Sequence, residues 1–285
     1  MINIAVLITC HNRKQKTIKC LHALFNQNDI ENIKLKVFLV DDGSEDGTEQ
    51  AIKELFSNII IIKGNGNLFW ARGMSLAWKE ALQFKEEFDY YLWLNDDTYL
   101  TNTAIMELLK TQKDGEEIVT GSVCDSITKR RTYGGTKFTN KFLTPFRYKI
   151  VDINGEPQEI DTINGNAVLI PHSVYAKIGS IDSHFEHAFA DVEYSLRAIK
   201  NNIKILLTAK HIAECEKKLF NYKENLNLSL FKKILNLFDR KEKPPKSWFR
   251  LCYKHGGVLW PIHFFIGYLK SIITILFKHN YIKKN

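Results

Sequence analysis

The first third of the chain alternates short apolar runs with amphipathic segments, and this alternation limits the fold more than any other feature. Continuous apolar runs of this length suit strands that are covered on both faces. The predicted strands are residues 4–9, 36–40, 59–62 and 90–94, and the predicted helices are residues 14–27, 48–56 and 70–84. The order predicts an α/β fold with a doubly wound, mainly parallel sheet flanked by helices.

The rest of the chain divides into three parts. Residues 118–170 are expected to be less regular and richer in strands, and residues 185–200 to hold a helix with Asp191 in its first turn. We expect an α/β domain over residues 1–215 and a basic, amphipathic helical extension over residues 216–285, with a hinge at residues 241–246 that contains Pro244 and Pro245.

Composition excludes several classes of protein. Five cysteines are scattered without CxxC spacing, so neither a structural zinc site nor a disulfide framework is indicated, and a reducing cytosol fits best. The first residues lack a basic segment and a small-residue cleavage site, so they predict a buried strand and not a signal peptide. The charged fraction of 25% is ordinary for a folded domain.

Polar clusters follow each of the four predicted strands. They are residues 9–13, 41–44, 64–67 and 95–97. In open α/β sheets ligands bind at the carboxyl edge of the strands, so these clusters predict a ligand site there. The glycine-rich patterns that bind dinucleotides or cradle phosphates are absent from this edge.

Two of these clusters are acidic. Adjacent carboxylates at a buried strand end repel each other unless a cation or ribose hydroxyls relieve them, so Asp96 and Asp97 suit a hard divalent cation that bridges to a diphosphate. The alternative is that Asp97 only caps the next helix. Asp41 and Asp42 can accept the imide N–H of a pyrimidine base. An Asx turn and helix cap explain Asp46 but leave these two residues unexplained.

In their order along the chain, five blocks resemble the family 2 glycosyltransferases. They are residues 5–13 (AVLITCHNR), 38–48 (FLVDDGSEDGT), 94–97 (LNDD), 179–186 (GSIDSHFE) and 190–197 (ADVEYSLR). Residues 67–78 are similar to bacterial surface-polysaccharide transferases, including rhamnosyltransferase-like members. The resemblance implies the GT-A fold and covers roughly residues 1–215.

The resemblance also implies residue roles. A nucleotide-sugar would contact Thr9, His11, Arg13, Asp41, Asp42, Asn67, Arg72, Asp96 and Asn164. Of these, Asp42 would bind the base, Asp96 the ribose, and Asn164 would line the sugar pocket. Asp97 would hold Mn²⁺ or Mg²⁺, with His211 as a further metal or diphosphate ligand. Asp191 would be the general base that takes the proton of the acceptor hydroxyl.

Each role has a structural alternative. Asp191 could cap its helix, His211 could be a half-buried structural histidine, and Arg72 could pair with Glu80 or Asp89 on the surface. Asn164 could belong to a tight turn, and the aromatic residues 69, 70 and 78 are more typical of a core. One position departs from the family, which commonly has Glu before the base where this chain has Ala190. That departure bears on the acceptor more than on catalysis.

The tail mixes large apolar side chains with lysines and arginines. Residues 247–282 suit a helical segment that lies on a membrane surface, whereas Pro261, His263 and Lys270 disfavour a membrane span. The alternative is a pair of helices that packs on the catalytic domain or on a second copy of the chain in a homodimer. Nucleic acid ranks lowest as a partner, because the lysines are interleaved with large aliphatic residues.

The sequence therefore predicts an inverting transferase that moves a hexose or deoxyhexose from a nucleoside-diphosphate sugar to a glycan acceptor. A lipid-linked oligosaccharide of a bacterial surface polysaccharide is the expected acceptor, at the inner face of the plasma membrane. One alternative is a sugar-nucleotide pyrophosphorylase, although residues 9–13 do not supply its basic glycine-rich loop. The other is a non-catalytic member of the fold that binds a glycan or a protein partner.

Overall fold

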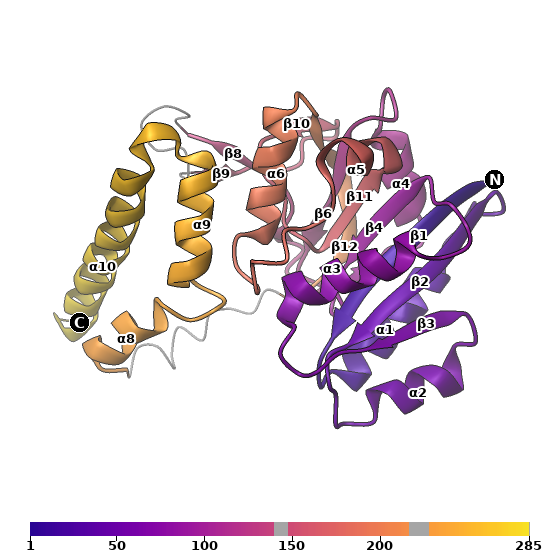
Figure 1. Cartoon of the computed structure of the whole chain (residues 1–285), viewed down its shortest axis with the longest axis horizontal. Helices are drawn as coiled ribbons and strands as arrows, with labels where there is room; N and C mark the ends of the chain where they lie inside the picture. The colour runs from indigo at the N-terminus through magenta and orange to yellow at the C-terminus, as the bar shows by residue number, and fades with distance from the viewer. Residues whose placement is uncertain (140–147, 217–227, 285) are drawn as a thin grey trace.

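A mixed sheet of ten strands forms the centre of the computed structural model, which describes residues 1–139, 148–216 and 228–284 (Figure 1). Its strands are β1 (Ile2–Cys10), β2 (Ile33–Asp41), β3 (Ile59–Lys63), β4 (Tyr90–Leu94), β5 (Tyr99–Leu100), β6 (Ile118–Cys124), β7 (Arg131–Tyr133), β10 (Gln158–Ile160), β11 (Ala167–Pro171) and β12 (Ile205–Glu214). β8 (Thr136–Phe138) and β9 (Tyr148–Ile150) form a separate antiparallel pair.

Helices cover both faces of this sheet and continue beyond it. They are α1 (Lys14–Phe25), α2 (Thr48–Leu55), α3 (Phe69–Leu82), α4 (Ala104–Thr111), α5 (His172–Ile178), α6 (Ala190–Lys200), α8 (Leu230–Asn236), α9 (Pro245–His255) and α10 (Trp260–Lys284), with a 3₁₀ turn η1 (Gly257–Leu259). All the strands and helices predicted in the first third of the chain are present, with ends shifted by at most a few residues.

The strand order is β10-β12-β6-β11-β4-β1-β2-β3. β4, β1, β2 and β3 run parallel, as the sequence predicts, so their carboxyl ends meet at one edge. β11 lies antiparallel between β4 and β6, and β12 returns parallel to β6. The sheet is therefore mixed at its centre, which brings the residues just before β11 next to those just after β4.

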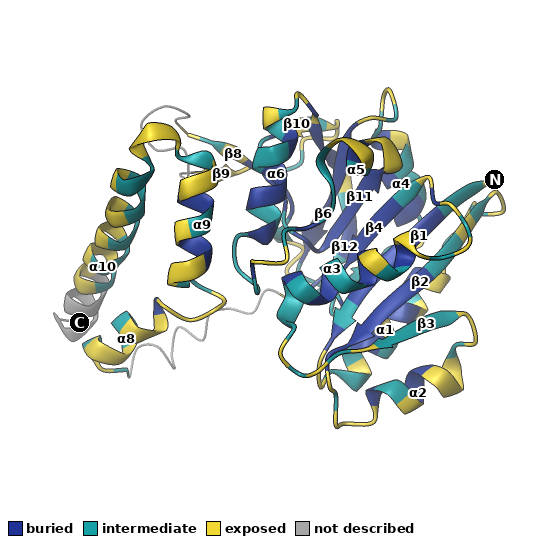
Figure 2. Cartoon of the chain, viewed as in Figure 1, coloured by how far each residue is buried: buried dark blue, intermediate teal, exposed yellow. Residues whose placement is uncertain are grey.

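Apolar side chains fill both faces of the sheet. One cluster joins the sheet to α3, α6 and α9, and the other joins it to α1, α2 and α4. Residues 4–8 of β1 are fully buried, which explains their unbroken apolar pattern. Figure 2 shows the central strands buried and the outer sides of the helices exposed.

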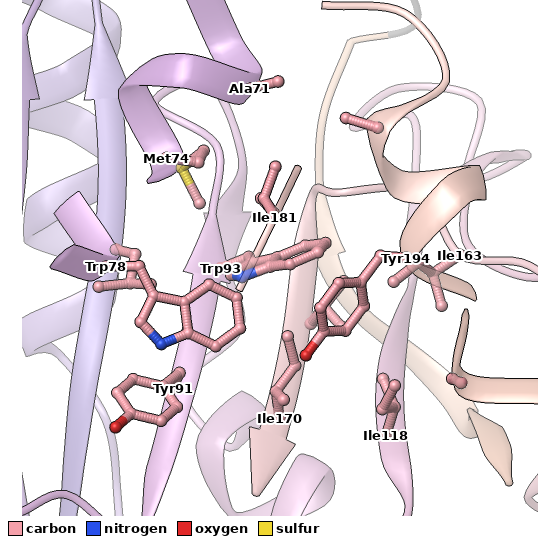
Figure 3. Close-up of a cluster of buried hydrophobic side chains, with 14 of the residues drawn as sticks. Ala71, Met74, Trp78, Tyr91, Trp93, Ile118, Ile163, Ile170, Ile181 and Tyr194 are labelled. Atoms are coloured by element: carbon pink, nitrogen blue, oxygen red, sulfur yellow. The ribbon is translucent and has the colours of Figure 1, made fainter. Parts of the chain in front are cut away.

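An aromatic group in the first cluster fixes α6 against α3 and β4 (Figure 3). The ring of Trp78 lies 5.0 Å from Tyr91, 5.8 Å from Trp93 and 5.9 Å from Tyr194. Tilted and edge-on contacts of this kind stabilise beyond the burial of area alone. Trp78 is therefore a core residue, and the group packs Tyr194 of α6 against α3 and β4.

The tail forms a helical hairpin beside the α/β domain (Figure 1). α9 packs through Trp248, Leu251 and Cys252 into the cluster that contains α6, and α10 packs on α9. The predicted hinge leads directly into α9, whose first residue is Pro245. Residues 217–227 of the predicted extension lie outside the described residues, as do the side chains of residues 278–284.

Most of α10 is exposed along its outer side (Figure 2). Residues Gly257–Phe277 are long and apolar enough to cross a membrane, with a mean hydropathy of 1.5, and 0% of that stretch is buried in the structure. Length and composition alone do not separate a span from a helix that lies in the interface.

Candidate active site

The carboxyl ends of β1 to β4 bring the four predicted polar segments together. Cys10 at the end of β1 pairs with Asp41 at the end of β2, and Asp41 pairs with Lys63 at the end of β3. β4 lies on the other side of β1 and leads into Asn95. The segments are far apart in the sequence, and the parallel order of the strands makes them neighbours.

The acidic pair after β4 shares one cation. Arg13 Nη1 lies 2.8 Å from Asp96 Oδ1 and 3.0 Å from Asp97 Oδ2. Burial raises the pKa of Asp96 to about 6, the charge of Arg13 opposes this shift, and the charge of Asp97 adds to it. Asp97 is the more accessible member, with 18% of its side chain exposed against 6% for Asp96. One guanidinium therefore serves two carboxylates at the strand end.

Asp42 holds the loop that leads into α3. Its carboxylate accepts three backbone hydrogen bonds. The donors are the N–H groups of Gly66, Leu68 and Phe69, at 2.8, 2.9 and 3.0 Å. Phe69 has a φ of +57°, which is unfavourable for a side chain of this size, and these bonds hold it there. Both oxygens of Asp42 are thus engaged in loop structure, and its contact with a base stays a prediction.

Thr9, His11 and Asn67 lie around this loop. A Cβ placed on Gly73 would come within 2.3 Å of Thr9 Oγ1, so α3 passes β1 at a distance that only glycine permits. His11 Nδ1 lies 2.6 Å from the carbonyl oxygen of Asp42, while the rest of this ring and Asn67 are exposed at the sheet edge. Asp41 is buried and accepts a hydrogen bond from the N–H of Ser44 at 3.0 Å, so its carboxylate supports the loop after β2.

Asp191 lies in the first turn of α6, as the sequence predicts. Its Oδ1 accepts the N–H of Val192 at 2.8 Å, and its carboxylate also accepts the N–H of Gly165. Burial raises the pKa of Asp191 to about 6, although these hydrogen bonds oppose the shift. A carboxylate with a pKa near this value is ionised at neutral pH and remains basic enough to accept a proton.

A short chain of contacts joins Asp191 to the acidic pair. Gly165 packs on the ring of Trp70, where a Cβ would lie only 2.1 Å from Cζ2. Trp70 Nε1 donates to Asn95 Oδ1 at 2.7 Å, and Asn95 directly precedes Asp96. Asp191 and Asp96 are therefore two ends of one packed group, although 95 positions separate them in the sequence.

Other predicted residues have partners that the sequence did not show. Arg72 contacts Glu186 and the carbonyl oxygen of Ser183, both at 3.3 Å, and not Glu80 or Asp89. Asn164 Oδ1 accepts the N–H of Gly134 at 3.3 Å and so links the segment before β11 to the segment between β7 and β8. The role of Asn164 toward a sugar stays a prediction.

The two predicted metal ligands have different surroundings. His211 Nδ1 lies 2.9 Å from Ser122 Oγ, and both burial and the charge of Arg131 lower the pKa of His211. Asp97 contacts Arg13 and has Cys215 Sγ 3.8 Å from its Oδ1. Within residues 1–139, 148–216 and 228–284, no three His, Cys, Asp or Glu side chains gather as a metal cluster.

The sequence does not reveal the contact between Trp70 and Asn95 or the fit of Gly165 on Trp70. The residues were visible, but their proximity depends on the antiparallel entry of β11. Ala190 stands where the family commonly has Glu. It is fully buried in the apolar cluster, so this position contributes to the core.

The sequence profile of glycosyl transferase family 2 matches residues 5–177, which is more than half of the chain. The chain belongs to glycosyl transferase family 2. No match to it is found among curated protein sequences.

Solved structures that resemble this family 2 member include glycosyltransferases. The TarS protein of S. aureus superimposes with a TM-score of 0.55 at 13% identity, over 88% of this chain and 42% of TarS. A structure of TarS residues 1–349 in complex with UDP-GlcNAc gives 0.57 at 13% identity, over 89% and 66%. GalNAc-T7 with UDP, GalNAc and Mn²⁺ gives 0.59 at 12% identity, over 90% and 55%. At this identity the likeness shows the GT-A fold, and the chain spans less than two thirds of each of these proteins.

Proposed function

We propose that this protein is an inverting glycosyltransferase that moves a hexose or deoxyhexose from a nucleoside-diphosphate sugar to a glycan acceptor. The single observation that carries the proposal is the packed group that joins Asp191, with its pKa near 6, to Asp96 and Asp97. In inverting transfer a base on one side of the anomeric carbon faces a departing diphosphate on the other, which needs these two functions within one site.

In this mechanism Asp191 takes the proton of the acceptor hydroxyl as that oxygen attacks the anomeric carbon. The hydrogen bonds from Val192 and Gly165 fix the orientation of its carboxylate. On the donor side, Asp96 binds the ribose, and the loop held by Asp42 lies beside the base with Thr9, His11, Arg13 and Asn67. The hydrogen bond between Trp70 and Asn95 holds the donor side and the acceptor side of the site in a fixed relative position.

The acidic pair fits a hard divalent cation. Carboxylate oxygens are the ligands that Mg²⁺ and Mn²⁺ prefer, and such ions often bind through one or two carboxylates plus substrate phosphates and water. Asp97 is accessible and Asp96 is left with a raised pKa, so a further positive charge relieves the pair. When bound, the cation stabilises the negative charge that develops on the leaving diphosphate. The structurally similar GalNAc-T7 binds UDP together with Mn²⁺, which supports this assignment.

The proposed acceptor is lipid-linked, with the tail lying on the inner face of the plasma membrane. One side of α10 packs on α9, where Trp248 Nε1 donates to the carbonyl oxygen of Phe264 at 3.0 Å. The other side exposes apolar residues at helical spacing, namely Ile262, Phe265, Ile266, Leu269, Ile273 and Leu276. The sequence has no Asp or Glu after Glu242, which favours an anionic lipid surface. Because one side of α10 is attached to α9, we favour a helix in the interface over a span.

A binding experiment tests the donor site. Thermal unfolding is followed with UDP, TDP or GDP, each with and without Mn²⁺, for the wild type, Asp97→Ala and Asp191→Asn. We expect one nucleotide to raise the Tm in the presence of Mn²⁺, the shift to disappear in Asp97→Ala, and Asp191→Asn to keep it. A folded wild type that responds to none of the nucleotides would argue for a non-catalytic member of the fold.

A vesicle experiment tests the surface role of α10. Co-sedimentation with phosphatidylglycerol vesicles is compared for the wild type, Leu269→Asp and the control Leu55→Asp, since Leu55 is a similarly exposed leucine on α2. We expect only Leu269→Asp to weaken binding, by about tenfold, because a charge would enter the apolar boundary. Equal binding of all three proteins would contradict membrane docking through this face.

A further inference from the structure

The amino end of α6 lacks a cap of its own. Phe189, at the N-cap position, has a φ of +72° and makes no side-chain hydrogen bond to the helix. An uncapped first turn leaves backbone N–H groups without local partners and tends to fray. Asp191 lies in this turn, and its Oδ1 accepts the N–H of Val192, so contacts from elsewhere in the molecule determine where the turn itself lies.

Helix α9 of the tail supplies such contacts through two carboxylates that flank Asp191 in the sequence. Lys254 Nζ lies 3.0 Å from Asp182 Oδ2 and also forms an ion pair with Glu193 Oε1. Arg250 Nε lies 2.7 Å from Asp182 Oδ2. Lys254 thus joins the start of the loop before α6 to the first turns of the helix itself.

The carboxylates of Glu193 and Asp182 at this junction stay ionised. Glu193 is fully buried, and burial alone would raise its pKa, but contacts from His255, Arg197 and Lys254 outweigh burial and lower the pKa. Asp182 behaves in the same way, because Arg250 and Lys254 hold its pKa well below the usual range. The junction is therefore ionised throughout the neutral range.

Two further contacts extend the junction along residues 182–189. Trp248 of α9 packs on the ring of Phe189 at 5.4 Å, and a Cβ on Gly267 of α10 would lie 2.4 Å from the same Trp248 ring. Arg240, before α9, lies 3.2 Å from Glu186 and 4.2 Å from the ring of Phe69. The tail thus contacts the segment before Asp191 at its start, middle and end.

We propose that the tail is a brace for the catalytic base, in which Lys254 is a positioning residue that acts on Asp191 through Glu193 and Asp182. The brace holds residues 182–189 and the first turn of α6 in the geometry that transfer requires. Trp248 contacts both Phe189 and α10, so the helix proposed to meet the membrane is one side chain away from the segment that positions the base. This inference rests on the proposed role of Asp191.

The test compares Lys254→Met with the rescue variant Lys254→Arg and the control Lys246→Met, an exposed lysine on the same helix. Hydrogen–deuterium exchange is measured in the full chain without substrate. We expect exchange in residues 182–193 to increase at least about threefold in Lys254→Met, and to stay near the wild-type rate in the other two variants. Unchanged exchange in Lys254→Met would overturn the brace.

A kinetic measurement then separates positioning from bulk structure. Hydrolysis of UDP-GlcNAc, UDP-glucose, TDP-rhamnose and GDP-mannose is screened, and the donor that reacts fastest is used. Lys254→Met is expected to lower kcat about tenfold or more with the donor KM within about twofold, and Lys254→Arg to restore most of the rate. The acid limb of the kcat profile should move to lower pH in Lys254→Met as Asp191 becomes more hydrated. Faster exchange with unchanged kcat would also overturn the inference.

Two controls keep these outcomes distinct. If the wild type hydrolyses none of the donors and binds no nucleotide, the proposed function fails, while the exchange result still decides whether the tail braces the segment. If Lys254→Met does not fold, Arg240→Met replaces it, since Arg240 is half exposed and pairs with Glu186 at the surface. Faster exchange over residues 186–189 in that variant supports the brace, and wild-type exchange overturns it.

Discussion

Two carboxylate pairs in this molecule, each with one buried member, differ in the pKa shift of that member. At the sheet edge, Asp96 shares the guanidinium of Arg13 with Asp97, and burial raises its pKa to about 6. Beside α6, Asp182 and Glu193 are surrounded by Arg197, Arg250 and Lys254, and their pKa values are lowered. The side chains are alike, but the second pair has more cations and hydrogen-bond donors beside it, and these outweigh burial.

This contrast distinguishes a ligand-binding site from a structural junction between parts of the protein. A pair whose charges are fully compensated has no electrostatic need for a ligand and connects parts of the protein. A pair left with excess negative charge favours the arrival of a cation, and functional sites commonly hold such perturbed groups. Asp191 is connected to both regions, through Gly165 and Trp70 on one side and through its own helix turn on the other.

The largest expected effect comes from Asp191→Asn. This change removes the proton acceptor with little change in shape, so kcat should fall about 10³-fold, within the range that general bases contribute. Nucleotide affinity, measured by calorimetry with Mn²⁺, should stay within about twofold of the wild type. Turnover near the wild-type rate would remove Asp191 from the mechanism. The two carboxylate pairs would then not be connected through a catalytic residue.

The pH dependence gives the next effect. Asp191 accepts a proton only when it is ionised, and its pKa is raised to about 6, so kcat/KM should fall about tenfold per pH unit below 6. Above about pH 7 this group is fully ionised, and its titration no longer changes the rate. A profile measured in buffers of constant ionic strength that stays flat down to about pH 5 would show that no carboxylate with a raised pKa limits the reaction.

Asp182→Asn tests the junction that α9 forms with Asp182 and Glu193. Removal of this charge leaves Arg250 and Lys254 without a compensating carboxylate, and it should lower the free energy of unfolding at pH 7 by about 2 kcal/mol. Because the pKa of Asp182 in the folded protein lies below that of the unfolded chain, its contribution is complete above about pH 4 and is lost as pH falls through the folded-state pKa. Urea unfolding of the wild type and Asp182→Asn at pH 7 and pH 3 measures the loss of unfolding free energy at each pH. An equal loss at pH 7 and pH 3 would contradict this account.

Asp96→Asn should have a smaller effect of opposite sign. The folded-state pKa of Asp96 is raised from 3.8 to about 6, so at pH 7 the ionised carboxylate opposes folding. Loss of the hydrogen bond from Arg13 offsets part of the gain, and we expect a net stabilisation of about 1 kcal/mol by urea unfolding. If Asp96→Asn destabilised the protein as much as Asp182→Asn, the two pairs would both be structural and the contrast between them would be wrong.

The sequence determined the class of fold and the edge at which the site lies. Unbroken apolar runs at residues 4–9 and 90–94 predict strands buried on both faces, and polar residues after each run show where the strands end. These are local signals, because the period of apolar residues and the position of turn residues are properties of short segments. The helix with Asp191 in its first turn was predicted for the same reason. The resemblance to the family came from the order of the sequence blocks along the chain.

Only the tertiary structure decided which of these residues meet. The direction of β11 cannot be read from its apolar pattern, yet it brings Gly165 onto Trp70 and Asn95 next to Asn166. Arg250 and Lys254, which pair with Asp182 and Glu193, come from α9, more than 60 residues further along the chain. Ion pairs of this kind leave no periodic trace in the sequence, because a lysine on an amphipathic helix looks the same whether it faces water or a buried carboxylate.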